Sequence, residues 1–360
     1  MRKSSFFNNT VWITVSRILT LASKFALDVI IANTAGRQLY GKFSYYLLIV
    51  LTMSTFLSFG IQNANNYYIN SGRLHFRIVK RINLVFVCVI SVTGLGIFLL
   101  LNALPGKTLA EYIHDPITMI VGGCGFCFIL LNNIVISLVQ SLKQIKHYSA
   151  LFMLNAIMLI AAFLIVFRFI DVSLSSLIIV YVSSFLMTNI IGVLILNKIA
   201  APGGSSGTVK GKDYKMFFSF GFKTYLCSVA IFFLPRIDMF LINSMLPVEN
   251  VGYYRIALTL SEKMIFLTIA VAALLKPTLP SMEEKESIGF IKRIFRINLV
   301  VILLLSGLFF AGSGLLLTLY NPEYAVAVLP LRILLIASVF LSMNTILDEF
   351  FLGRHKLGQN

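Results

Sequence analysis

Charged residues are scarce in this 360-residue chain: they make up 12% of it, against about 25% in an ordinary soluble protein. Hydrophobic residues make up 58%, and the mean hydropathy is +0.90. This composition excludes a soluble globular domain and predicts a membrane protein. The chain also does not begin with a charged region, a short apolar core and a small-residue cleavage site, so the first apolar run is expected to be a permanent helix.

Cysteine is equally scarce. The four cysteines, Cys88, Cys124, Cys127 and Cys227, all fall within apolar runs, which excludes a disulfide framework in the connecting loops. Cys124 and Cys127 form a C-x-x-C pair, but no second pair and no neighbouring histidine completes a zinc shell. We therefore expect neither a metal site nor a cofactor.

Apolar runs of membrane-spanning length dominate the sequence. A helix needs about 20 apolar residues to cross a bilayer, and ten segments meet this length. We predict an all-α, polytopic membrane protein with about 10 transmembrane helices. The segments are 10–33, 43–66, 83–103, 117–140, 149–168, 174–197, 218–243, 253–275, 297–319 and 328–350.

Basic residues gather in the connections on one side of these segments, which predicts that this side and the N-terminus are cytoplasmic. The connections on the other side hold Arg37, Lys42 and Lys107. The cytoplasmic connections hold Arg2, Lys3, Arg73, Arg77, Lys80, Arg81, Lys143, Lys146, Lys198, Lys210, Lys212, Lys215, Lys285, Lys292, Arg293, Arg296, Arg354 and Lys356. This asymmetry also explains most of the net charge of +16, so nucleic acid is not an expected partner.

The second part of the chain repeats the first. Four matches follow one another in order, which indicates parallel repeats related by an axis along the membrane normal. Asp28–Thr34 matches Asp238–Ser244, Gly41–Tyr45 matches Gly252–Arg255, Arg81-Ile-Asn-Leu-Val85 recurs letter for letter as Arg296–Val300, and Leu142–Lys146 matches Leu352–Lys356.

The repeat predicts the domain organisation. Residues 1–200 are expected to form an N-terminal six-helix bundle, 201–217 a flexible cytoplasmic linker rich in glycine and serine, and 218–360 a second bundle of four helices. The second bundle lacks counterparts of the last two helices of the first. We therefore expect a truncated repeat, with a complete protein of roughly 400–420 residues and twelve helices.

Several of these features together resemble the polysaccharide-biosynthesis transporters, the flippases for O-antigen and capsular repeat units. They are Asp28 near the outer end of the first helix, the Gly41 helix start, the Gly353-Arg-His-Lys356 turn and the two bundles. The resemblance places the chain in the superfamily of multidrug, oligosaccharidyl-lipid and polysaccharide exporters. It implies a MATE-like fold around a central cavity, and the transfer of an undecaprenyl-diphosphate-linked oligosaccharide across a bacterial inner membrane. It further implies membrane lipids, a polysaccharide polymerase and a chain-length regulator as partners.

Charged residues inside the apolar segments are the candidate site, because an ionised group facing lipid costs roughly 3 kcal/mol or more. Six are cations and three are acids, so cations are in excess. Because arginine and lysine suit phosphate oxygens, this excess favours a diphosphate ligand. The cations are Arg17, Lys24, Lys223, Arg236, Arg255 and Lys263, and the acids are Asp28, Asp238 and Glu262.

The individual roles of these residues allow more than one interpretation. Arg17, Lys24 and Asp28 fall within ~40° of one another around a helix, so they form one charged stripe. Each acid could couple transport to an ion or could merely neutralise a neighbouring cation. Asp28 has a repeat counterpart in Asp238, whereas the position equivalent to Lys24 is Leu234. Lys24 and Arg236 are therefore the preferred substrate contacts.

Two other interpretations of sequence features stay open. Pro235 should break its helix and let Arg236 and Asp238 face one cavity. The amides Gln62, Asn63, Asn65 and Asn66 are typical of a helix leaving the membrane, although they could bind sugar hydroxyls.

Two other functions compete with a flippase. A multidrug or organic-cation antiporter of the same superfamily would need carboxylates for its cationic substrates, whereas here cations are in excess. A membrane polymerase or glycosyltransferase would need an extramembrane catalytic surface, and the external connections are short, with only Glu111, His114 and Asp115 clustered in one of them. No nucleophile, metal or paired-carboxylate arrangement suggests an enzyme.

Overall fold

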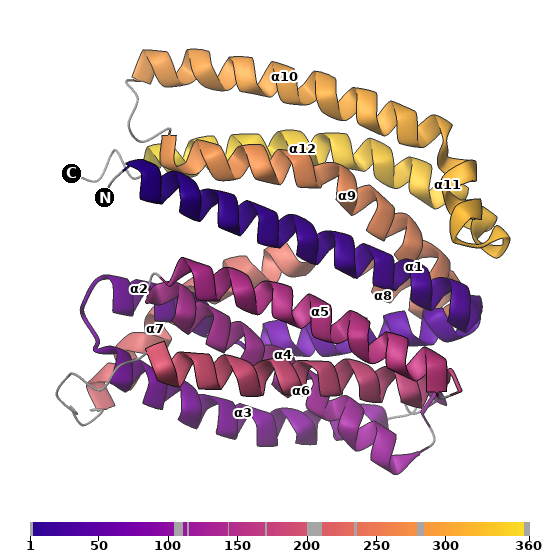
Figure 1. The fold of residues 1–360 in the computed structure, drawn as a ribbon, viewed down its shortest axis with the longest axis horizontal. Coiled ribbons are helices and arrows are strands. Elements are labelled where there is room, and N and C mark those ends of the chain that lie inside the picture. Colours follow the sequence, from indigo (N-terminus) through magenta and orange to yellow (C-terminus); the bar gives the residue numbers. More distant parts are fainter. Residues whose placement is uncertain are drawn as a thin grey trace. The chain divides into compact units, whose positions relative to one another are not determined.

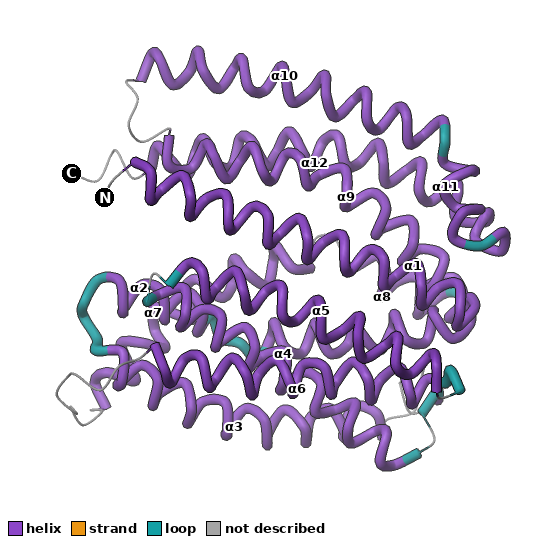
Figure 2. Tube along the Cα trace, in the orientation of Figure 1, coloured by secondary structure: helices purple, strands orange, loops and turns teal. Residues whose placement is uncertain are grey.

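The protein is all-helical. The computed structural model describes residues 3–103, 111–113, 115–142, 144–169, 171–199, 211–233, 236–278 and 284–355, and throughout these ranges the regular elements are helices (Figure 2). The chain divides into two compact units, residues 1–248 and 249–360, which are considered in turn. This confirms the predicted all-α class.

The described part of the first unit contains eight helices. Three of them, α4 to α6, coincide within about four residues with predicted apolar segments, and α3 begins seven residues before its segment. Helix α4 packs against α1, α2, α3, α5 and α6 (Figure 1). Helix α4 is therefore the central helix of this unit. The helices are α1 (Lys3–Phe56), α2 (Ile61–Asn70), α3 (Phe76–Ala103), α4 (Pro116–Ser141), α5 (Ile145–Phe169), α6 (Leu174–Ile199), α7 (Gly211–Phe233) and α8 (Ile237–Met245).

One end of this unit is basic. The connections between α2 and α3, α4 and α5, and α6 and α7 lie at this end, which is on the left in Figure 1. We call it the basic end, and the end holding the α3–α4 and α5–α6 connections the opposite end. The described basic residues at or near these connections are Arg73, Arg77, Lys80, Arg81, Lys146, Lys198, Lys212 and Lys215.

Helix α1 turns sharply at Gly36. This residue has φ 70° and ψ 170°, which side chains other than hydrogen disfavour. The Tyr40 hydroxyl donates to the Asp28 carboxylate at 3.5 Å, although a straight helix would separate these residues by about 18 Å. The two parts of α1 therefore lie against each other beside the turn. The first part corresponds to the predicted segment 10–33, and the second part together with α2 corresponds to the segment 43–66.

A second interruption separates α1 from α2. The chain bends by 43° there, and Phe59 and Gly60 both have positive φ, 45° and 67°. The Phe59 ring stacks on Tyr225 of α7 at 5.5 Å between centroids and meets Phe86 of α3 edge-on at 6.2 Å. A positive φ is uncommon for a bulky residue, so these ring contacts help to hold the bend.

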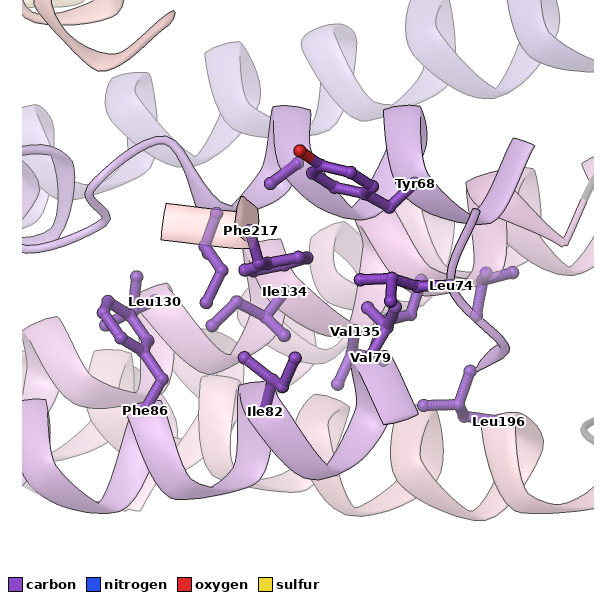
Figure 3. Close-up of a cluster of buried hydrophobic side chains, with 14 of the residues drawn as sticks. Tyr68, Leu74, Val79, Ile82, Phe86, Leu130, Ile134, Val135, Leu196 and Phe217 are labelled. Carbon is purple, nitrogen blue, oxygen red and sulfur yellow. The ribbon is translucent and has the colours of Figure 1, made fainter. Parts of the chain in front are cut away.

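Helix α7 packs into the core of the first unit at the basic end. Phe217 is fully buried in a cluster that includes Tyr68 of α2 and Ile134 of α4 (Figure 3). The Tyr68 hydroxyl donates to the Met216 carbonyl at 3.0 Å, and Tyr67 stacks on Phe220 at 4.3 Å. The core of this unit thus includes Phe217, which was predicted to belong to a linker at 201–217. Residues 201–210 of that predicted linker lie outside the described residues. The bundle boundaries 1–200 and 218–360 stay a prediction.

The second unit is built from the last helices of the chain. Helix α10 packs along α12, and Leu275, Ile291 and Ile346 bring α9, α10 and α12 together in a small core. The predicted segment 297–319 is interrupted at Gly312. The elements are α9 (Val248–Thr278), α10 (Glu284–Ala311), α11 (Ser313–Tyr320), the 3-10 helix η3 (Pro322–Ala327) and α12 (Val328–His355).

The repeated pentapeptide has the same role in both units. In the first, the Asn83 side chain donates to Asn65 Oδ1 at 2.7 Å, and Asn65 donates to Ser137 Oγ at 2.8 Å. In the second, Asn298 donates to Ser342 Oγ at 2.9 Å and accepts from the Thr268 hydroxyl at 3.1 Å. All six side chains are buried. Each unit therefore has one polar triad that joins three helices.

This result corrects one interpretation of the amides near the end of the second apolar segment. Asn65 is completely buried, so its polarity does not reflect a helix leaving the membrane. Its side chain is occupied by Asn83 and Ser137. The amide is thus an interhelical contact of a kind common in membrane bundles.

Replacing Asn83 with leucine should destabilise the protein by about 1–3 kcal/mol, because Asn65 Oδ1 loses its donor in a buried site. Unfolding of the purified protein in detergent measures the effect. Asn70→Leu is the matched control, since Asn70 is exposed and donates to Asn66 of its own helix. Equal stability of the two variants would contradict a structural role for the triad.

The helix lengths and hydropathies support fewer membrane spans than the ten predicted segments. Six helices in the described part of the chain are long and apolar enough to cross a membrane, or seven if α1 and α2 form one broken span. The count of ten stays a prediction.

Candidate substrate-binding site

The charged stripe predicted in the first segment lies on α1. Lys24 is exposed, and Asp28, one turn further on, is partly buried. The Asp28 carboxylate accepts the hydrogen bond from Tyr40, whose side chain is buried. Asp28 therefore takes part in closing the turn at Gly36, which is a structural role. Lys24 has its side chain outside the packed core.

Two further predicted cations can be placed only by their helices. Arg17 belongs to α1 and Lys223 to α7, and both side chains lie outside the described part of the structure. Their assignment to the site stays a prediction.

Arg236 and Asp238 follow a break between two helices, as their sequence predicts. Helix α7 ends at Phe233 and α8 begins at Ile237, while Pro235 itself lies outside the described residues. Arg236 caps α8 with φ −136° and ψ −14°, so it does not continue a regular helix. Asp238 accepts from the backbone NH of Met239 at 2.7 Å. Both side chains are partly buried.

The remaining three candidates lie on α9 in the second unit. Arg255 and Lys263 are partly buried, and Glu262 is exposed. Arg255 and Glu262 are separated by seven residues, which places them on the same side of the helix. The convergence of all nine charged residues on one cavity stays a prediction.

Arg332 lies in the predicted apolar segment 328–350, near the start of α12, and was not among the nine candidate charges. Its Nε donates to the Ser313 hydroxyl at 3.0 Å, and its guanidinium lies 4.9 Å from the centroid of the Phe310 ring. Both partners belong to the second unit. A hydroxyl group and an aromatic ring of the same unit therefore stabilise the charge of Arg332.

Metal-binding groups are not brought together in the described part of the chain. No three histidine, cysteine, aspartate or glutamate side chains there could hold an ion. Of the C-x-x-C pair, Cys124 and Cys127 are both free thiols.

The fold is shared with membrane transporters. An outward-facing multidrug resistance MATE family transporter of the MOP superfamily matches with a TM-score of 0.66 and 14% identity, covering 96% of this chain and 81% of its own. A MATE transporter in the straight conformation gives 0.65, with the same identity and coverage. A mutant of the Vibrio cholerae MATE transporter VcmN gives 0.56 at 12% identity, covering 96% and 84%. No curated protein sequence matches the chain.

Together with the apolar helices, this similarity defines a multi-pass membrane protein with a MATE-like transporter fold. Residues 6–283 match the family described as polysaccharide biosynthesis protein, and the chain belongs to that family. The family resemblance expected from the sequence is thus confirmed.

Proposed function

We propose that this transporter flips an undecaprenyl-diphosphate-linked oligosaccharide from the inner to the outer leaflet of the bacterial cytoplasmic membrane. The fold suits a multidrug antiporter equally well, so the observation that carries the proposal is the charge of the apolar segments. Among the nine candidate residues the cations outnumber the acids by six to three, which favours an anionic substrate and disfavours a cationic drug.

Within this proposal Lys24 and Arg236 contact the diphosphate. Lys24 supplies an exposed point charge on α1, and Arg236 supplies a planar group at a helix break, where its direction is not fixed by a regular helix. Arg17, Lys223, Arg255 and Lys263 add to the positive potential. Asp238 and Glu262 are candidates for ion coupling, whereas the bond from Tyr40 favours a structural role for Asp28.

The orientation follows from the positive-inside rule. The basic end of the first unit faces the cytoplasm, together with the N-terminus, and the opposite end faces outward. The connection between α6 and α7 then serves as a cytoplasmic linker, and an N-terminal bundle and a C-terminal bundle rock around the substrate. A polysaccharide polymerase and a chain-length regulator are the partners expected on the outer side.

Proteoliposomes test the proposal directly. The purified chain is reconstituted with a fluorescent undecaprenyl-diphosphate oligosaccharide in the inner leaflet, and the appearance of its sugar outside is followed with a lectin. Protein-dependent appearance of the sugar supports the proposal. Transport of a cationic dye such as ethidium, without movement of the lipid, would establish the antiporter instead. A surface-polymer assay in a strain lacking the gene checks the result in cells.

A further inference from the structure

A pocket with both polar and apolar lining lies at the opposite end of the first unit, just after the turn at Gly36. Its volume is about 350 Å³, within the range of small-molecule sites. Three separate stretches of chain form it: the start of the second part of α1, the residues before α4, and the connection from α8 to α9. The lining residues are Gln38, Lys42, Glu111, Tyr112, Pro247 and Val248.

The aromatic wall of this pocket is held in place from α1. The Lys42 ammonium lies 5.5 Å from the centroid of the Tyr112 ring, a cation–π distance. The Tyr45 ring meets Tyr112 edge-on, with 6.3 Å between centroids and 81° between planes. Tyr45 is itself buried and hydrogen-bonded to the Asn243 side chain of α8. The wall is therefore set before a ligand arrives, which lowers the entropic cost of binding.

The chemistry of the lining is mixed and electrically balanced. The Gln38 amide can both donate and accept, the Glu111 carboxylate accepts, and the Lys42 ammonium donates. One cation and one acid leave no net charge, so the pocket does not select a phosphate or a cationic drug. The ring of Tyr112 and the side chains of Pro247 and Val248 supply apolar surface.

Asp115, the other acid near this pocket in the chain, already accepts hydrogen bonds from its own helix. Asp115 caps α4 by accepting from the Thr118 backbone NH at 2.9 Å and from the Thr118 hydroxyl at 2.6 Å. These hydrogen bonds from Thr118 lower the pKa of the Asp115 carboxyl. Asp115 therefore stays an anion serving the helix, and Glu111 is the acid that remains for a ligand in the pocket.

We infer that this pocket binds a sugar residue. A sugar ring presents hydroxyls that need both donors and acceptors, together with apolar C–H faces that pack on aromatic and aliphatic side chains, and the pocket offers each of these. The inference rests on the proposed function, in which this end faces outward. The pocket then receives the head of the oligosaccharide on the outer side of the membrane.

The experiment uses the full chain in lipid nanodiscs and saturation-transfer NMR with four probes: glucose, galactose, N-acetylglucosamine and pyrophosphate. At least one sugar should receive saturation from the protein. Tyr112→Leu should weaken its binding about tenfold, through the lost aromatic contact, and Gln38→Ala and Glu111→Gln should weaken it as well. Glu323→Gln is the matched control, an exposed glutamate in η3 that does not line the pocket, and it should bind as the wild type does.

Thermal unfolding checks that each variant is folded, and Tyr112→Phe separates loss of the ring from loss of the hydroxyl. Absence of transfer to every sugar, or equal binding by wild type and Tyr112→Leu, would overturn the inference. Pyrophosphate binding that is lost on replacing Lys42 with alanine, without sugar binding, would also overturn it. Because the flipping assay is separate, flipping by a protein that binds no sugar here removes only the pocket assignment. Sugar binding without flipping removes only the proposed function.

Discussion

Replacing Lys24 with alanine should lower flipping by roughly 10- to 100-fold, the effect expected for the loss of a charged hydrogen bond worth about 1.5–3 kcal/mol. Lys24 is exposed on α1, so its removal leaves no hole in the core. The variant should therefore reach the membrane in normal amounts. Lys24→Arg should retain much of the activity, because the positive charge is kept.

The control for this prediction is Lys212→Ala, an exposed lysine at the start of α7 outside the candidate site. It should flip lipid at the wild-type rate. The rates are measured in the proteoliposome assay at equal protein content. If Lys24→Ala and Lys212→Ala flip lipid equally fast, Lys24 does not contact the substrate.

Replacing Gly221 with leucine should force α7 away from the bend between α1 and α2. A Cβ atom at this position would lie 2.8 Å from the Phe59 carbonyl oxygen, which belongs to the backbone and cannot move cheaply. Overpacking of this kind costs about 1–3 kcal/mol. The displaced helix would also lose the stacking of Tyr67 on Phe220. We expect transport to be lost, because α7 would no longer pack into the core of the first unit.

Cross-linking measures the position of α7 independently of transport. In a chain whose four native cysteines are replaced, Tyr67→Cys and Phe220→Cys place thiols on the two packed helices α2 and α7, and a short thiol-specific cross-linker should join them readily when Gly221 is present and poorly in Gly221→Leu. Gly211→Leu is the control on the same helix, since a Cβ there meets nothing within 4 Å. Undiminished cross-linking in Gly221→Leu would show that α7 accommodates the side chain.

The sequence predicts the helices well where an apolar run coincides with one straight helix. Segments 83–103, 117–140, 149–168 and 174–197 correspond to α3 to α6. The bends are harder to predict, because hydropathy stays high through them. The break at Phe59 and Gly60 and the one at Gly312 both fall inside apolar runs. Pro235 could be used to predict a break because proline lacks the NH that a helix needs.

The surroundings of polar residues are also hard to predict from the sequence alone. The repeat of Arg81–Val85 as Arg296–Val300 correctly indicated equivalent positions, and Asn83 and Asn298 indeed occupy matching triads. The burial of Asn65 was missed, since an amide near the end of an apolar run looks solvent-facing until its partners on other helices are known. The pocket at the opposite end was missed for a similar reason, because its residues are separated by up to 210 positions in the chain.

The turn at Gly36 also constrains how α1 can move. Almost no loop separates its two parts, and the contact between Tyr40 and Asp28 ties them together just below the turn. A change in the tilt of the first part of α1 is therefore expected to change the tilt of the second part. Lys24 lies on the first part of α1, and Gln38 and Lys42 lie on the second part. Under the proposed mechanism, movement of Lys24 during transport would thus reposition the pocket lined by Gln38 and Lys42 at the same time.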